Sequence, residues 1–209
     1  MIRILVADDH IVVRRGLRMI LLEGFPGATI EEVGDAEDLV KQVIKENWDV
    51  VISDLSMPGR SGLDALQQIK QIKPSLPVLI LSIHPEDQYA IRVLKAGASG
   101  YLSKDMAPDE LVIAVQKVML GKKYITAAVA EKLTSIFDDD KNKAPHELLS
   151  DREFSVLKML ASGKSVSEIA ETLFLSVTTV STYRARIISK MNLKNNAELT
   201  LYAIENKLL

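Results

Sequence analysis

Four side chains suited to cation binding and phosphoryl transfer each follow an apolar segment in the first half of the chain. They are Asp8, Asp9, Asp54 and Lys104. Clustered carboxylates repel one another unless a cation neutralises them, and a site built from oxygen ligands suits Mg²⁺. A carboxylate beside Mg²⁺ can attack phosphorus and form an aspartyl phosphate, and the ammonium group of Lys104 can pair with phosphoryl oxygens. These residue types therefore indicate a magnesium-dependent phosphoryl-accepting site.

The segment 48–59 shows how the chain positions such a group. Residues 50–53 are mostly β-branched and apolar, which predicts a short buried strand ending at Asp54. Pro58 restricts φ and Gly59 permits unusual backbone angles, so a loop follows. In an open parallel α/β sheet, ligands bind at this end of the strands. Taken alone, Asp54 fits the cap of a turn or helix equally well.

Strands and helices alternate through the first 120 residues. The predicted strands are residues 2–6, 29–33, 50–53, 78–81 and 100–103, and the predicted helices are residues 10–23, 36–46, 62–72, 86–96 and 108–120. This pattern predicts an α/β fold with a doubly wound, five-stranded parallel sheet of the flavodoxin-like order. We expect that order to make the first, third and fifth strands neighbours, so that the four chemical groups meet.

Two further side chains lie near the same strand ends. Ser82 follows the fourth strand, where its hydroxyl could donate to a phosphoryl oxygen, and Tyr101 lies three residues before Lys104. A helix-capping serine and a core tyrosine explain the same positions equally well.

The second part of the chain changes character. Residues 122–147 are predicted to be a linker, with a possible helix over 126–137 and a flexible polar stretch over 138–145. Residues 148–209 are predicted to form an all-α domain of four helices. The helices begin after Ser150, after Ser165 or Ser167, after Ser176 and at Asn195.

Residues 165–191 have the spacing of a helix-turn-helix motif. On the second helix, Val180, Ile187 and Met191 share one face, and small polar residues with arginine occupy the other. Such a face can enter the major groove of double-stranded DNA, although an ordinary bundle with a polar outer face has the same pattern. The predicted DNA contacts are Thr178, Thr179, Ser181, Thr182, Arg184, Ala185, Arg186 and Lys190.

Composition limits the class of protein. The 209-residue chain has no cysteine, which excludes disulfides and Cys-based zinc sites. Because no apolar run has the length of a membrane span, we expect a cytoplasmic protein with no membrane partner. Residues 1–140 hold 16 Lys and Arg against 21 Asp and Glu, a net charge of -5, whereas residues 141–209 hold 10 against 7, a net charge of +3. This asymmetry indicates two functions, but the basic excess alone does not predict nucleic-acid binding.

Two sets of motifs resemble known families. Residues 1–120 resemble a CheY-like receiver domain, in Asp8-Asp9, the segment 54–59, Ser82, the segment 96–98 and Lys104. Residues 148–209 resemble the LuxR-type helix-turn-helix domain, in the segments 149–153, 160–165, 168–170 and 175–180. Together they are similar to the NarL/FixJ class of two-component response regulators over nearly the whole chain.

The resemblance implies that Asp54 accepts a phosphoryl group from a cognate sensor histidine kinase. The implied Mg²⁺ ligands are Asp8, Asp9, Asp54 and the backbone carbonyl of Ser56, with Asp8 acting through a bound water. The residues at the family's switch positions are Ser82, Tyr101 and Lys104.

The resemblance also implies that phosphorylation controls homodimerisation, sequence-specific binding to promoter half-sites and therefore transcription. Such a protein is not an enzyme beyond slow self-catalysed phosphorylation from small donors and loss of its own phosphate. The recognition helix departs from the family, which often has Lys where this chain has Thr178 and Ser181, and His where it has Tyr183. The family's usual base contacts therefore do not transfer to these positions.

Two other functions compete with this interpretation. A phosphatase that works through a phosphoaspartate on a similar sheet usually needs a second Asp two residues after the nucleophile, and here Ser56 occupies that position. An adaptor whose C-terminal bundle binds protein instead of DNA would fail to shift genomic DNA in a gel.

Overall fold

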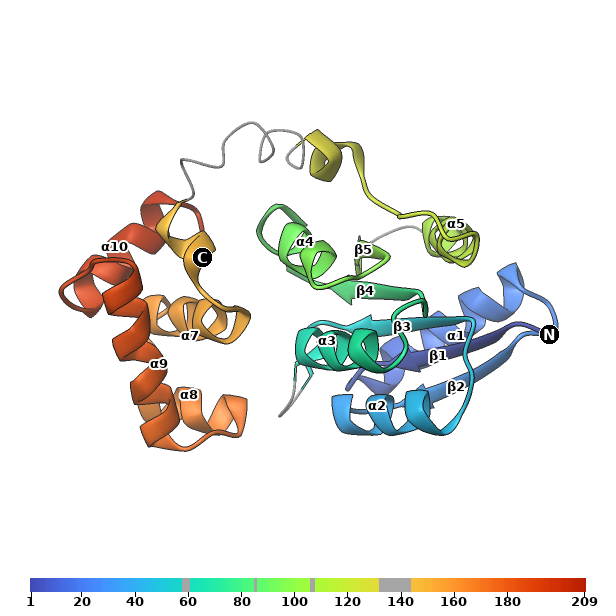
Figure 1. Cartoon of the computed structure of the whole chain (residues 1–209), viewed down its shortest axis with the longest axis horizontal. Helices are drawn as coiled ribbons and strands as arrows, with labels where there is room; N and C mark the ends of the chain where they lie inside the picture. Colours follow the sequence, from blue (N-terminus) through green and yellow to red (C-terminus); the bar gives the residue numbers. More distant parts are fainter. Residues whose placement is uncertain (58–60, 85, 106–107, 132–143) are drawn as a thin grey trace. The chain divides into compact units, whose positions relative to one another are not determined.

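The chain folds into two compact units, Met1–Leu133 and Thr134–Leu209 (Figure 1). The computed structural model describes residues 1–57, 61–84, 86–105, 108–131 and 144–209. Three predictions fall partly outside the described residues: the loop after Asp54 at residues 58–60, the helix 126–137 from residue 132 onward, and the flexible stretch up to residue 143. Residues 127–131 are helical.

A five-stranded parallel sheet forms the centre of the first unit. Its strands are β1 (Arg3–Ala7), β2 (Thr29–Val33), β3 (Val50–Asp54), β4 (Val78–Ser82) and β5 (Gly100–Ser103). Their order is β2-β1-β3-β4-β5, which confirms the predicted doubly wound, flavodoxin-like sheet. The expectation that β3 and β5 are neighbours is wrong, because β4 pairs with both of them.

Helices cover both faces of this sheet. They are α1 (Ile11–Gly24), α2 (Ala36–Lys45), α3 (Gly62–Ile72), α4 (Glu86–Lys95) and α5 (Pro108–Met119). Helices α1 and α5 pack together on one face and α2 and α3 on the other (Figure 1). Side-chain caps start two of them: Asp35 accepts a hydrogen bond from Asp38 N at 2.8 Å, and Ser61 forms a capping box with Asp64.

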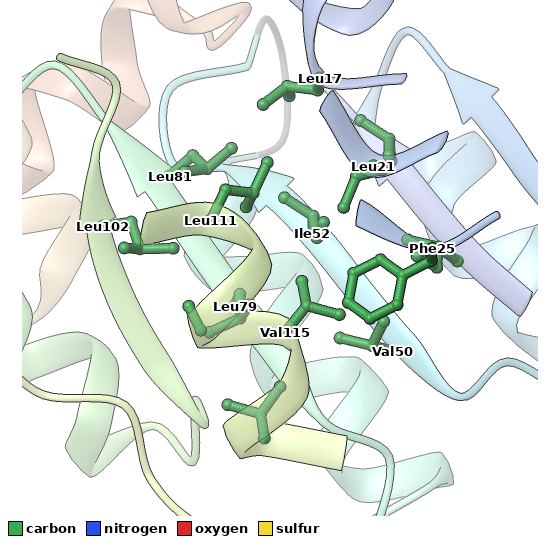
Figure 2. Close-up of a cluster of buried hydrophobic side chains, with 14 of the residues drawn as sticks. Leu17, Leu21, Phe25, Val50, Ile52, Leu79, Leu81, Leu102, Leu111 and Val115 are labelled. Carbon is green, nitrogen blue, oxygen red and sulfur yellow. The ribbon is translucent and has the colours of Figure 1, made fainter. Parts of the chain in front are cut away.

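The core beneath α1 and α5 holds the strand ends in place (Figure 2). Its labelled side chains are Leu17, Leu21, Phe25, Val50, Ile52, Leu79, Leu81, Leu102, Leu111 and Val115. Each fully buried aliphatic side chain of this kind contributes roughly 1.5–3 kcal/mol. The edge that carries the polar groups therefore rests on a close-packed, apolar support.

The chain stays on this unit beyond residue 121, the predicted end of the receiver. Tyr124 forms a parallel bridge with Gly100, and its backbone N–H donates to Ser99 O at 2.8 Å. Its hydroxyl donates to Glu110 at 2.7 Å, and Val129 is also buried. The first part of the predicted linker is thus packed against β5 and α5.

The second unit is the predicted bundle of four α-helices. Its elements are the short 3₁₀ turn η1 (Pro145–Leu148), α7 (Asp151–Ala161), α8 (Val166–Leu173), α9 (Val177–Lys190) and α10 (Asn196–Glu205). Capping boxes at Ser150 and Ser165, and N-caps at Ser176 and Asn195, start the helices. The sequence did not predict η1, whose His146 Nδ1 lies 2.8 Å from the Tyr202 hydroxyl oxygen.

Gly62 allows α3 to begin directly beneath the loop that follows Asp54. A Cβ at this position would lie 1.9 Å from the Asp54 carbonyl oxygen, whereas a Cβ at Gly16 in α1 meets nothing within 4 Å. We predict that Gly62→Ala lowers the free energy of unfolding by about 3 kcal/mol, since backbone must move. The control Gly16→Ala should raise it by about 0.5–1 kcal/mol through helix propensity. Urea unfolding of both variants measures this, and a Gly62→Ala protein as stable as the parent would contradict it.

Candidate functional site

Two buried carboxylates and a half-buried lysine meet at the carboxyl ends of the strands. Asp8 follows β1 and is 0% exposed, and Asp54 is the last residue of β3 and is 3% exposed. Lys104 follows β5, and its Nζ lies 2.7 Å from Asp8 Oδ2 and 2.9 Å from Asp54 Oδ2. The structure thus brings together the charged residues that the sequence predicted, and the flexible lysine side chain spans the width of β4 to do so.

Burial and charge act on Asp54 in opposite directions. Burial raises the pKa of the Asp54 carboxyl above its ordinary value, and the hydrogen bond and charge of Lys104 only partly offset this rise. For Lys104, burial lowers the pKa, but hydrogen bonds to Asp8 and Asp54 outweigh it, so that the pKa is raised. The lysine is therefore held as a cation between two carboxylates.

The carboxylates have the arrangement of a metal site. Ligand atoms of Asp8, Asp9, His10 and Asp54 all lie within 4.8 Å of one another. Asp8 Oδ2 and Asp9 Oδ1 are buried oxygen atoms, and each has a side-chain nitrogen 2.7 Å away, Lys104 Nζ and His10 Nδ1 respectively. Three carboxylates and one ammonium group leave two negative charges, which suits a divalent cation with a preference for oxygen. This acidic pocket is compatible with Mg²⁺ binding.

Histidine residues complete the pocket, and sequence reasoning missed both of them. His10 donates its backbone N–H to Asp8 Oδ1 at 2.8 Å. His84, in the loop after β4, places Nε2 3.0 Å from Ser56 Oγ and stacks on the ring of Tyr89. Their positions directly after Asp8-Asp9 and two residues after Ser82 were the available signals.

Two of the three predicted switch residues, Ser82 and Tyr101, bind the backbone of His84. Ser82 is fully buried, and its Oγ accepts a hydrogen bond from His84 N at 3.0 Å. Tyr101 is 2% exposed, and its hydroxyl donates to His84 O at 2.7 Å. Ser56, on the other side of the pocket, donates a backbone hydrogen bond to Asp54 that lowers the pKa of that carboxyl. Groups from β3, β4 and β5 are therefore linked through one loop residue.

In the second unit, α8, a short turn and α9 form the predicted helix-turn-helix. Val180, Ile187 and Met191 are buried against the other helices. The opposite face of α9 is exposed along its length, as the helical spacing predicted. The exposed members of that face are Thr178, Ser181, Thr182, Ala185, Arg186 and Ser189.

Three of the predicted DNA contacts also bind within the unit. Arg184 Nε donates to Asn196 Oδ1 at 2.7 Å. Lys190 Nζ lies 2.6 Å from Glu153 Oε2, and that carboxylate is buried. Thr179 Oγ1 lies 2.8 Å from the N-cap hydroxyl of Ser176. The contacts of Arg184 and Lys190 connect α9 to α10 and α7, whereas that of Thr179 stays within the N-cap of α9.

Comparison with known proteins identifies both units. The chain matches the response regulator receiver domain over residues 4–116 and the luxR family of bacterial regulatory proteins over residues 147–203. It is 41% identical to the response regulator UvrY of Escherichia coli K12, over 100% of this chain and 96% of UvrY. This chain belongs to the NarL/FixJ class of response regulators. The resemblance noted in the sequence is thereby confirmed, as is its implication of transcription regulation by phosphorylation.

Other relatives of the response regulator agree. The oxygen regulatory protein NreC of Staphylococcus carnosus is 37% identical over 99% of each chain. A structure of RcsB from Salmonella enterica serovar Typhimurium, bound to promoter rprA in the presence of the phosphomimetic BeF3⁻, is 29% identical and has a TM-score of 0.65, covering 97% of this chain and 98% of RcsB. The promoter-bound RcsB structure and the match to the luxR family are consistent with a role other than that of an enzyme.

Among the described residues of the response regulator, no helix is long and apolar enough to cross a membrane.

Burial of the charged Asp54 carboxylate should destabilise the folded protein in Mg²⁺-free buffer at neutral pH. Its pKa is raised in the folded state above the ordinary value of 3.8, so the folded protein binds a proton more readily than the unfolded chain. Stability should therefore fall as pH rises through the folded pKa. We predict that Asp54→Asn raises the free energy of unfolding by roughly 1 kcal/mol at pH 7, and that the gain shrinks as pH falls toward 3.8.

Denaturant unfolding between pH 4 and 8 measures this difference. Glu23→Gln removes an exposed carboxylate from α1 and should change stability by less than about 0.5 kcal/mol. A gain from Asp54→Asn that is independent of pH would show that ionisation of Asp54 does not oppose folding.

Proposed function

We propose that this response regulator accepts a phosphoryl group on Asp54 from a cognate sensor histidine kinase, and that the modification controls homodimerisation and binding to promoter half-sites. The observation that carries the proposal is the position of the buried Asp54 carboxylate, 2.9 Å from Lys104 Nζ and within one ligand cluster with Asp8 and Asp9. The kinase as donor follows from the receiver family.

The residues of the pocket have distinct parts in this transfer. An Asp54 carboxylate oxygen attacks phosphorus, forming an O–P bond while the bond from phosphorus to the donor breaks and the donor keeps the electron pair. Mg²⁺, when bound, neutralises charge on the carboxylates and on the phosphoryl oxygens. Its proposed ligands are Asp8, Asp9, Asp54 and the backbone carbonyl of Ser56. Lys104 pairs with a phosphoryl oxygen.

Ser82 and Tyr101 are the proposed residues that respond to the modification. The Ser82 hydroxyl has one donor, and its acceptor side is used by His84 N. It is therefore able to donate to a phosphoryl oxygen without giving up the bond from His84. Because Tyr101 binds the same residue through its carbonyl, a change at Ser82 acts on both contacts.

Double-stranded DNA is the proposed partner of the second unit. The exposed face of α9 would lie in the major groove, with DNA contacts from the eight residues predicted from the sequence. Solved structures support this for related proteins, since RcsB has been described bound to promoters and as two dimers on two DNAs. We propose the cytoplasm as the location, because chromosomal DNA and the phosphoryl donor meet there. The proposed domain bounds are residues 1–121, a linker over 122–147 and residues 148–209, although the start of that linker packs on the first unit.

The phosphoacceptor can be identified by mass. We predict that the full-length protein incubated with a small phosphodonor and Mg²⁺ gains one phosphoryl group and that Asp54→Asn gains none, because the Asp54 oxygen is the nucleophile. Intact-mass spectrometry measures both. Asp105→Asn removes an exposed acid next to Lys104 and should be labelled like the parent. Labelling of Asp54→Asn at the parent level would refute the assignment.

Arg186 tests the DNA interface. It is exposed on α9 and has no hydrogen bond or ion pair with other described residues, so we predict that Arg186→Ala lowers operator affinity by roughly tenfold and reduces its salt dependence. Fluorescence anisotropy at two salt concentrations measures both effects. Lys45→Ala, which removes one positive charge from α2 instead, should bind like the parent. An unchanged affinity for Arg186→Ala would place the interface elsewhere.

A further inference from the structure

The exposed face of α9 is rich in methyl groups. Thr178, Thr182 and Ala185 lie on it within two helical turns, and Val177 at its start is 52% exposed. The helix carries no Asn, Gln, Asp or Glu, which are the side chains that read adenine and cytosine by hydrogen bonds. Direct recognition by amide or carboxylate groups is therefore not available to this helix.

The threonine hydroxyls are partly committed to the helix itself. Thr182 Oγ1 donates to Thr178 O at 2.9 Å, four residues back. This bond uses the only donor of the hydroxyl and restrains the side chain, which is exposed. The side chain offers the groove an apolar contact and a weak acceptor.

The positively charged side chains of α9 differ in whether they are already bound to other helices of the unit. Arg184 is held by Asn196 on α10, and Lys190 is held by the buried Glu153 on α7. The bond between Lys190 and Glu153 is costly to break, because Glu153 would remain buried without its positively charged partner. Arg186, the remaining positively charged residue of this helix, takes part in neither contact. It is therefore the side chain of α9 best placed for a guanine or a phosphate.

From these observations we infer that α9 reads its operator mainly through the 5-methyl groups of thymine, contacted by Thr178, Thr182 and Ala185. The inference rests on the proposed DNA-binding function and specifies its readout. Thymine is the base that presents a methyl group in the major groove, and apolar side chains recognise it by contact. The operator should accordingly contain thymines in each half-site at the positions that face α9.

The size of the effect follows from the area that a methyl group buries. Removing one buried methyl contact costs about a fourfold loss of affinity. Two symmetric half-sites double the number of contacts, so that the losses multiply when a dimer binds.

Deoxyuridine provides the probe, since it lacks the 5-methyl group but keeps the hydrogen-bonding groups and the phosphate charge of thymidine. Sites are first selected from a random double-stranded pool with the phosphorylated full-length protein. A selected site is then synthesised with thymidine or with deoxyuridine in the half-sites, and affinities are compared at one salt concentration. We expect a loss of about fourfold for each contacted thymine.

A matched pair of variants assigns the contact. The double variant Thr178→Ser, Thr182→Ser removes both methyl groups and keeps both hydroxyls, so it should bind the thymidine site more weakly and lose most of the deoxyuridine effect. Thr172→Ser on α8 makes the same change in a residue whose hydroxyl donates to Glu168 O at 2.7 Å, and should keep the full effect.

The outcomes distinguish a failure of the proposed DNA binding from a failure of methyl-group recognition. If no DNA is selected from the pool, the proposed function fails. If sites are selected but the parent binds deoxyuridine and thymidine duplexes equally well, DNA binding stands and methyl readout is overturned. If the double variant retains the full deoxyuridine effect, the methyl groups are read by other residues, and the assignment to Thr178 and Thr182 is overturned.

Discussion

The contact of Lys104 with two buried carboxylates is the interaction on which the first unit depends. Asp8 and Asp54 are almost completely removed from water, and two such charges side by side strongly oppose folding. Lys104 offsets this with bonds of 2.7 and 2.9 Å, but one cation leaves the cluster negative. The fold tolerates this residual cost because the sheet beneath the cluster is apolar and close-packed. A pocket that keeps this excess of negative charge is compatible with binding of a divalent cation.

A second buried ion pair has a different consequence in the other unit. Glu153 completes the capping box of α7 by accepting from Ser150 N at 2.8 Å, and the same carboxylate oxygen accepts from Lys190 at the end of α9. Burial raises the pKa of Glu153, but the bonds from Lys190 and Ser150 outweigh it and lower that pKa. The carboxylate therefore stays ionised and ties the start of one helix to the end of another. The recognition helix is thus oriented by polar contacts at its end as well as by the apolar face around Val180.

The sequence predicted the parts of the fold that depend on local pattern. The five strands, their order and the helix caps at Ser150 and Ser176 follow from apolar runs and short polar signals, and the structure confirms them. Features that depend on long-range geometry were missed. The predicted flavodoxin-like order already places β4 between β3 and β5, so the expectation that β3 and β5 are neighbours was inconsistent with that order. The packing of Tyr124 on β5 requires three-dimensional coordinates because no local pattern encodes it. His84 went unnoticed for a related reason, since its partners come from three different strands.

His84 connects several groups of the pocket through hydrogen bonds. Its backbone N–H is bound by Ser82, its carbonyl by Tyr101, and its ring lies 3.0 Å from Ser56 Oγ. The backbone N–H of Ser56 also donates a hydrogen bond to the Asp54 carboxylate. Under the proposed function, a phosphoryl group on Asp54 would compete for the Ser56 bond on one side and attract the Ser82 hydroxyl on the other. Both neighbours contact His84, so a displacement of either would act on the same residue. These hydrogen bonds are therefore the route we propose from Asp54 to His84.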